Sequence, residues 1–227
     1  MLTIHQATKK YYKQKGIFDI NIDIEEGMIV GVLGRNGSGK TTLLKAILGL
    51  ITLDKGDIRL DGKQVKDQYA QVSYICESGS YIAYMSAQEY GKFLQSYYPT
   101  FAMEEYLTML KQFEVDKEGA IQALSKGQQM KVEIAAGLAM DAMLYVLDEP
   151  FNALDVYAKE DTVKFLLKKF DEHKIVLIST HNIEEIEQVM DRCIILDKGC
   201  IVEDMRLETM QEEQQDLHDI LDKYRPR

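Results

Sequence analysis

The sequence is short of cysteine and has no long apolar run. Its three cysteines, Cys76, Cys193 and Cys200, are widely spaced and form no CxxC pair, which argues against a disulfide framework or a zinc site. No apolar run approaches the roughly 18 residues that a membrane-spanning helix needs. The first 20 residues lack the apolar core of a signal peptide. We therefore expect a soluble protein of the reducing cytosol.

Positive charge is also scarce. The chain carries 27 lysines and arginines against 37 acidic residues, a net charge of -10. Nucleic acid and anionic lipid both require basic faces, so neither is expected as a direct partner. The chain has 227 residues, of which 46% are hydrophobic. That is enough for one large domain, spanning residues 1–227, with an inserted lobe.

Apolar segments alternate with amphipathic ones along much of the chain. Short, β-branched runs that predict buried strands lie at residues 28–33 ("MIVGVL"), 143–147, 174–179 and 193–196. Helical spacing between them includes "TLLKAILGL", ended by Gly49, and "IEEIEQVM" at 183–190. This alternation predicts an α/β fold whose mostly parallel sheet is covered on both faces.

Three regions depart from this alternation of predicted strands and helices. Residues 1–27 and roughly 55–75 carry short alternating segments, which predict a small antiparallel β subdomain. Residues from about 80 to 140 have helical patterning and predict an inserted α-helical subdomain. The charged tail from about 205 to 227 is expected to be helical.

A glycine-rich stretch follows the first predicted buried strand and opens a helix. Residues 34–41, "GRNGSGKT", fit the G-x-x-x-x-G-K-[ST] pattern of a P-loop. Glycines let successive N–H groups point at phosphate oxygens, and the helix N-terminus favours negative charge. Lys40 is suited to the β- and γ-phosphates, and the Thr41 hydroxyl to Mg²⁺. The alternative is a glycine turn that caps an ordinary helix.

Two carboxylates end the apolar strand of "LYVLDEP". Burying Asp148 and Glu149 there is unfavourable unless they serve a cation or a proton. We expect Asp148 to hold Mg²⁺ and Glu149 to act as the general base for water. His181 follows the next predicted strand and is expected to orient that water at the γ-phosphate. The alternatives are a solvated acid pair and a structural histidine.

The order of "GRNGSGKT", "LSKGQ", "LYVLDEP", "NALD" and "STH" resembles the nucleotide-binding subunit of ATP-binding cassette (ABC) transporters, over roughly residues 2–205. The resemblance implies a P-loop NTPase core with an antiparallel β subdomain and an α-helical subdomain. It also implies that two subunits enclose two ATP molecules head to tail. The signature segment "LSKGQ" of one subunit then closes on the γ-phosphate held by the other.

The resemblance assigns roles to further residues. Ser125 offers a hydroxyl, Gly127 a close backbone approach, and Gln128 a fixed turn, while Lys126 replaces a usual glycine and is expected to point outward. Tyr11, or its neighbour Tyr12, matches the aromatic residue that stacks on adenine. The segment from Asn152 to Asp155 matches a loop that crosses the dimer interface. The full set of expected nucleotide contacts is Tyr11, Gly34, Arg35, Asn36, Gly37, Ser38, Gly39, Lys40, Thr41, Thr42, Ser125, Gly127, Gln128, Asn152 and Asp155.

Glu77 is a second departure from the family pattern, which has glutamine at this position. We expect Glu77 to join Thr41 and Asp148 as a Mg²⁺ ligand, and its charge to oppose closure until the metal neutralises it. A solvated loop acid without a role is the alternative.

These features predict an ATPase that uses ATP and Mg²⁺, pairs with a second copy or a paralogue, and drives a separate transmembrane permease. The chain would then sit at the cytoplasmic face of the cell membrane through that partner. It resembles the small ATPase subunits of bacterial drug, antibiotic and peptide exporters. Alternatives are an importer subunit, a soluble cassette acting on ribosomes or chromosomes, and a nucleotide sensor without turnover. A GTPase is disfavoured because no NKxD-type motif is present.

Overall fold

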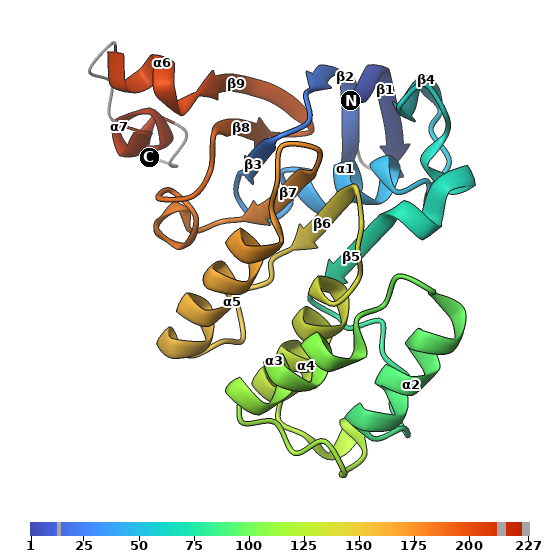
Figure 1. Ribbon diagram of the computed structural model, residues 1–227. Helices are drawn as coiled ribbons and strands as arrows, with labels where there is room; N and C mark the ends of the chain where they lie inside the picture. The colour runs from blue at the N-terminus through green and yellow to red at the C-terminus, as the bar shows by residue number, and fades with distance from the viewer. Residues whose placement is uncertain (13–14, 213–216, 224–227) are drawn as a thin grey trace.

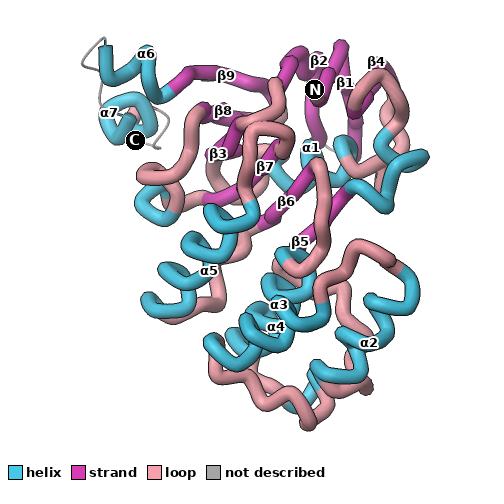
Figure 2. The backbone as a smooth tube through the Cα atoms, in the orientation of Figure 1, coloured by secondary structure: helices cyan, strands magenta, loops and turns pink. Residues whose placement is uncertain are grey.

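The computed structural model describes residues 1–12, 15–212 and 217–223, and its centre is a six-stranded sheet (Figures 1 and 2). The strand order is β5-β6-β7-β3-β8-β9. These strands are β3 (Met28–Leu33), β5 (Val72–Cys76), β6 (Leu144–Asp148), β7 (Ile175–Thr180), β8 (Arg192–Asp197) and β9 (Cys200–Arg206). Every pairing is parallel except β8 with β9, which is antiparallel. The prediction of an α/β fold with a mostly parallel sheet is confirmed.

Helices cover both faces of this sheet, as the alternation of strands and helices predicted. Leu144 and Val146 of β6 pack in one core cluster with α1 (Lys40–Ile47). Tyr145 and Leu147 point to the other cluster, which includes buried side chains of α5 (Val156–Lys169). Each face of the strand therefore has its own apolar layer, which explains why β6 is buried along its whole length.

A separate three-stranded antiparallel sheet has the order β2-β1-β4. Its strands are β1 (Leu2–Tyr11), β2 (Lys15–Ile24) and β4 (Lys55–Leu60). The expectation for residues 1–27 and for the start of 55–75 is met. The end of the second segment was assigned wrongly, because β5 pairs with β6 in the parallel sheet. Both faces of β5 are largely buried, which its alternating sequence does not show.

Three α-helices lie between β5 and β6: α2 (Ala87–Tyr97), α3 (Met103–Gln112) and α4 (Lys126–Leu138), with a short 3₁₀ turn, η3 (Ile121–Ala123), before α4 (Figure 1). A close contact fixes α4 against β5. A Cβ on Gly137 would lie 2.2 Å from Ile75 Cγ1, so only glycine allows this approach. The Ser73 hydroxyl also donates a 2.8 Å hydrogen bond to the Gly137 carbonyl. This lobe is therefore anchored to the edge of the sheet beside the strand that leads into Glu77.

The prediction of an α-helix at residues 183–190 is wrong. Only a short 3₁₀ turn, η4 (Ile183–Glu185), forms there. Thr180 Oγ1 donates to Glu185 at 2.8 Å, and Asn182 accepts from the Glu184 amide at 3.3 Å. These local side-chain bonds compete with a continuous helix. Ile183 still packs into the core. The apolar spacing of residues 183–190 therefore reflects burial and does not indicate an α-helix.

The strand β9 continues to Arg206, and the charged tail predicted from about residue 205 follows it. Two short helices follow, α6 (Leu207–Glu212) and α7 (Leu217–Asp222). The part of the tail prediction that covers 213–216 and 224–227 lies outside the described residues. Within the described ranges, no helix combines the length and the apolar character that crossing a bilayer requires.

Candidate functional site

The P-loop joins the end of β3 to the start of α1. Gly34 and Gly39 have φ of +151° and +113°, a backbone region that side chains other than glycine rarely adopt. A Cβ on Gly34 would also lie 2.5 Å from Ser38 Oγ. Lys40 is only 5% exposed, and its ammonium donates to the Gly34 carbonyl at 2.7 Å. The loop thus turns back on itself and holds its lysine inside the turn.

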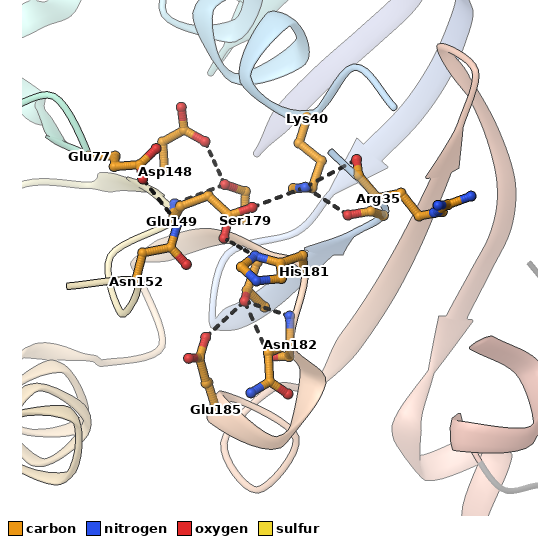
Figure 3. A network of polar contacts seen from close by, with 12 residues as sticks. Arg35, Lys40, Glu77, Asp148, Glu149, Asn152, Ser179, His181, Asn182 and Glu185 are labelled. Carbon is orange, nitrogen blue, oxygen red and sulfur yellow. Dashed lines mark hydrogen bonds and ion pairs between the residues drawn. The ribbon is translucent and has the colours of Figure 1, made fainter. Parts of the chain in front are cut away.

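Glu149 joins the P-loop to the end of β7 (Figure 3). Its Oε1 lies 3.0 Å from Lys40 Nζ, and its Oε2 lies 3.0 Å from His181 Nδ1. The residue is 8% exposed and has a φ of +51°, which is uncommon outside glycine. Backbone strain of this kind gathers at functional sites, where the surrounding structure enforces it. The predicted phosphate-binding lysine and the predicted histidine therefore both contact the carboxylate of Glu149, the predicted base.

Asp148 lies deeper, at the end of β6, and is 5% exposed. Its Oδ1 accepts from Thr41 Oγ1 at 3.1 Å and from Ser179 Oγ at 2.6 Å. A carboxylate beside a hydroxyl is the oxygen set that Mg²⁺ prefers. Ser38 Oγ, in the P-loop, is the one buried side-chain polar atom of the described residues without a hydrogen-bond partner. An unpaired hydroxyl inside a glycine turn fits a phosphate, so the residues present suit both groups.

Ser179 is a site residue that the sequence analysis missed. Its hydroxyl donates to Asp148 and also lies 3.1 Å from the Glu149 amide nitrogen, from which it accepts. The parallel register places Ser179 directly opposite Asp148. The available signal was a polar residue near the end of a buried strand, two residues before the histidine. Ser179 therefore holds the carboxylate of Asp148 and the backbone of Glu149.

An open cleft of about 450 Å³ runs along the P-loop. It is lined by Tyr11, Lys15, Gly16, Arg35, Asn36, Gly37, Gly39, Lys40, Thr41, Thr42, Glu77, Glu149 and Asn152. Tyr11 is 45% exposed at its margin, and Lys9 Nζ lies 5.8 Å from the centre of its ring. The structure therefore brings most of the predicted nucleotide contacts together, including the aromatic residue.

The "LSKGQ" segment lies elsewhere and does not line this cleft. Ser125 is the N-cap of α4, where its hydroxyl accepts from the Gln128 amide at 3.3 Å and the Gln128 side chain accepts from the Ser125 amide at 3.2 Å. Lys126 is exposed, in line with the expectation. Gly127 is close to the loop after β6, since a Cβ there would meet the Ala153 carbonyl oxygen at 2.7 Å. Within one chain, Ser125 and the P-loop belong to separate sites.

The loop at residues 152–155 is held at both ends by its own chain. Asp155 caps α5 by accepting from the Ala158 amide at 2.9 Å, and it pairs with Lys131 of α4 at 3.0 Å. The Ala158 hydrogen bond, followed by the Lys131 contact, lowers the pKa of Asp155. At the other end, the Asn152 side chain donates to Glu77 Oε1 at 3.1 Å. Glu77 thus faces both the cleft and this loop, and its role as a metal ligand stays a prediction.

Comparison with known proteins agrees with this geometry. Residues 17–152 match the family model described as ABC transporter. The chain is 30% identical over 220 residues to the SkfA peptide export ATP-binding protein SkfE of Bacillus subtilis, covering 94% of this chain and 92% of the relative. It is 35% identical over 214 residues to the sulfate/thiosulfate import ATP-binding protein CysA of Bacillus cereus, of whose length it spans 60%. The taurine import protein TauB of Escherichia coli is 34% identical over 207 residues, with 88% of this chain and 80% of TauB covered.

Solved structures share the fold. An ATP-binding subunit of an ABC transporter superposes with a TM-score of 0.82 at 24% identity, over 94% of this chain and 93% of its own. A dimeric bacterial ABC transporter cassette superposes with a TM-score of 0.79 at 25% identity, over 91% of this chain and 99% of its own.

Proposed function

This chain belongs to the ABC transporter family as an ATPase domain, and we propose that it hydrolyses ATP within a dimer and drives a separate membrane-spanning partner. The observation that carries the proposal is that the buried carboxylate of Glu149 contacts both Lys40 and His181. It assembles a phosphate-binding cation, a carboxylate base and a histidine at one point of the P-loop cleft.

The chemistry follows from these positions. The P-loop amides and Lys40 bind the ATP phosphates, with Tyr11 at the cleft margin for the adenine. Thr41 and Asp148 are the residues that would hold Mg²⁺, which neutralises phosphate charge when bound. Glu149 accepts a proton from water as the water oxygen bonds to the γ-phosphorus and ADP leaves. A base of this kind contributes about 10²- to 10⁴-fold in rate.

A second cassette completes the site in this proposal. Ser125 and the N-terminus of α4 are exposed at a surface distinct from the cleft of the same chain. A helix N-terminus attracts phosphate. The partner cassette's copy of this turn therefore supplies the missing side of the γ-phosphate pocket. One chain carries both half-sites, so a homodimer is sufficient, although a paralogue could take one place.

We further propose export, of a drug, antibiotic or peptide, through a permease at the cytoplasmic face of the membrane. The similarity to SkfE over nearly its full length supports export, whereas the similarities to CysA and TauB favour import. Purifying the complex with its permease in vesicles and following substrate movement with ATP on one side decides the direction. Uptake into the compartment that lacks the cassettes supports export.

Mixing two inactive variants tests the dimer. Lys40→Ala removes the phosphate lysine, and Ser125→Arg blocks the signature turn. Each homodimer should release little phosphate. Random pairing gives about half of the dimers one site in which both faulty elements are absent, so the mixture should regain activity. Recovery requires sites shared between chains. A mixture that stays as inactive as its components contradicts the shared site, and equal rates with ATP and GTP contradict the assigned substrate.

A further inference from the structure

Glu133 is a buried acid outside the nucleotide site. It lies on α4, where its side chain is 2% exposed. Its carboxylate accepts from the Ser80 amide at 3.0 Å and from the Ser80 hydroxyl at 2.8 Å, and Cys76 Sγ lies 3.8 Å away. Among the described residues no basic group lies within ion-pair distance of it. A buried carboxylate with neutral partners alone is unfavourable, because charge is costly to remove from water without a counter-ion.

Burial also raises the pKa of Glu133, and the contacts from Ser80 offset this only in part. Lys126 does not serve as the missing counter-ion. It borders a small cavity of about 20 Å³ that also touches Glu133, but it forms no ion pair with the acid there. Lys126 is exposed and lies seven positions before Glu133 on α4, about 10 Å along the helix.

A second, larger pocket also has Glu133 in its lining. Its volume is about 310 Å³, and its lining includes residues of β5, α2 and α4. Four tyrosines share its lining with Glu133 and Ser80, namely Tyr69, Tyr74, Tyr90 and Tyr98. The faces of aromatic rings attract cations, and the attraction grows when water is excluded. A desolvated carboxylate surrounded by tyrosines is thus chemistry suited to an organic cation.

We propose that this pocket binds one basic side chain, arginine or lysine, presented by a partner polypeptide. The buried carboxylate supplies the charge complementarity, and a guanidinium can bind a carboxylate through two parallel hydrogen bonds. The rest of the lining is mostly apolar and includes Leu50, Leu94 and Met140. That lining suits the alkyl stem of the basic residue and apolar neighbours in its sequence, which a free inorganic cation lacks.

The pocket is distinct from the nucleotide cleft, because the residues that line the two do not overlap. Ser80 nevertheless lies three residues after Glu77, on the loop that borders the cleft. A cation bound at Glu133 therefore acts on the residue that anchors this loop. If the polypeptide is the membrane partner, that identification rests on the proposed function, whereas the pocket chemistry does not.

A pair of capped peptides tests the pocket directly. Acetyl-Leu-Arg-Leu-amide is titrated into the full chain without nucleotide, while the amide resonance of Ser80 is followed by NMR. The neutral isostere, acetyl-Leu-citrulline-Leu-amide, is the control ligand. We expect saturable shifts at Ser80 with the arginine peptide and at least about tenfold weaker binding with citrulline, as for the loss of a charge-assisted hydrogen bond. Equal binding of the two peptides, or no binding of either, overturns the proposal.

Two further arms identify the group and the source of the cation. Glu133→Gln keeps hydrogen-bonding groups for Ser80 and should lose the preference for arginine, whereas Glu104→Gln, the same change at an exposed position of α3, should keep it. Thermal melts establish that both variants fold. Methylguanidinium alone should bind more weakly than the peptide, and equal affinity would reject a polypeptide occupant. None of these measurements requires ATP hydrolysis, so a failure here is separable from a failure of the proposed function.

Discussion

Glu77 and Asn152 are hydrogen-bonded across the mouth of the nucleotide cleft, Nδ2 to Oε1 at 3.1 Å. Glu77 directly follows β5, and Asn152 lies in the loop after β6, the strand that ends at Asp148. The contact therefore links two loops that leave neighbouring parallel strands. At its far end the Asn152 loop is tied to α4 through Asp155 and Lys131. The helical lobe and Glu77 therefore both contact the same loop, residues 152–155.

Glu77→Gln separates the charge of this residue from its hydrogen bond, since glutamine can still accept from Asn152. We expect the variant to hydrolyse ATP faster than the wild type at limiting Mg²⁺, because one negative charge near the γ-phosphate is removed. The difference should be about three- to tenfold, equivalent to ~1 kcal/mol. Phosphate release measured against Mg²⁺ concentration checks this. Glu77→Ala, which also loses the Asn152 contact, is the matched control, and superimposable curves for wild type and Glu77→Gln would reject a role for the charge.

The two departures from the family pattern should depend on each other. Glu77 and Lys126 both border the small cavity beside α4. Opposite charges near one cavity partly neutralise each other, so the effect of replacing both residues should differ from the sum of the two single effects. A double-mutant cycle with Glu77→Gln and Lys126→Gly, read as ATPase rate, should show a coupling of about 0.5 kcal/mol or more. Strict additivity would mean that the two residues act independently.

Glu149→Gln should lower ATP turnover by about 10²- to 10⁴-fold, the usual contribution of a general base. An ATP-bound dimer should accumulate, visible by size-exclusion chromatography with ATP and Mg²⁺. His181→Ala leaves Glu149 in place but removes its 3.0 Å partner, so a smaller loss is expected. Wild-type turnover in Glu149→Gln would remove this residue from the role of base.

Stability should depend on pH through Glu133. Burial raises its pKa in the folded protein, so the folded state keeps the proton to higher pH than the unfolded chain does. Folding stability from this group is therefore greatest below the unfolded value of about 4.3 and falls as pH rises through the folded pKa. Glu133→Gln lacks this dependence. Urea unfolding at several pH values should show the variant gaining on the wild type as pH rises from about 4 to 7, and a constant difference would contradict it.

Local patterns were sufficient for the elements whose signal is local. The P-loop glycines, the parallel strands and the stop at Gly49, whose φ is +67°, follow from short stretches of sequence. The membership of β5 in the parallel sheet does not, because it depends on the contact with β6 and on α4 packing against Ile75. The segment at 183–190 shows the converse failure. Its apolar spacing was compatible with a helix, but the hydrogen bonds of Thr180 and Asn182 shortened it to one turn.

The site divides in the same way. Lys40, Asp148, Glu149 and His181 belong to recognisable motifs, and the sheet brings them together. Ser179 was missed because its role comes from register with Asp148 in a strand 31 positions away. Glu133 was missed because a single acidic residue in a helix is usually exposed to solvent. Its burial depends on the hydrogen bond from Ser80, which is distant in sequence. Both are products of tertiary proximity between loops and strands distant in sequence.

Lys40 and Glu149 form an ion pair in which both side chains are more than nine-tenths buried. Phosphate binding by the lysine and proton acceptance by the carboxylate therefore depend on the same contact. One ammonium cannot neutralise the carboxylate and an incoming phosphate equally well at the same distance. A triphosphate in the cleft therefore competes with the Glu149 carboxylate for the ammonium group of Lys40. Phosphate binding and the ion pair of Glu149 are thus coupled through one ammonium group, that of Lys40.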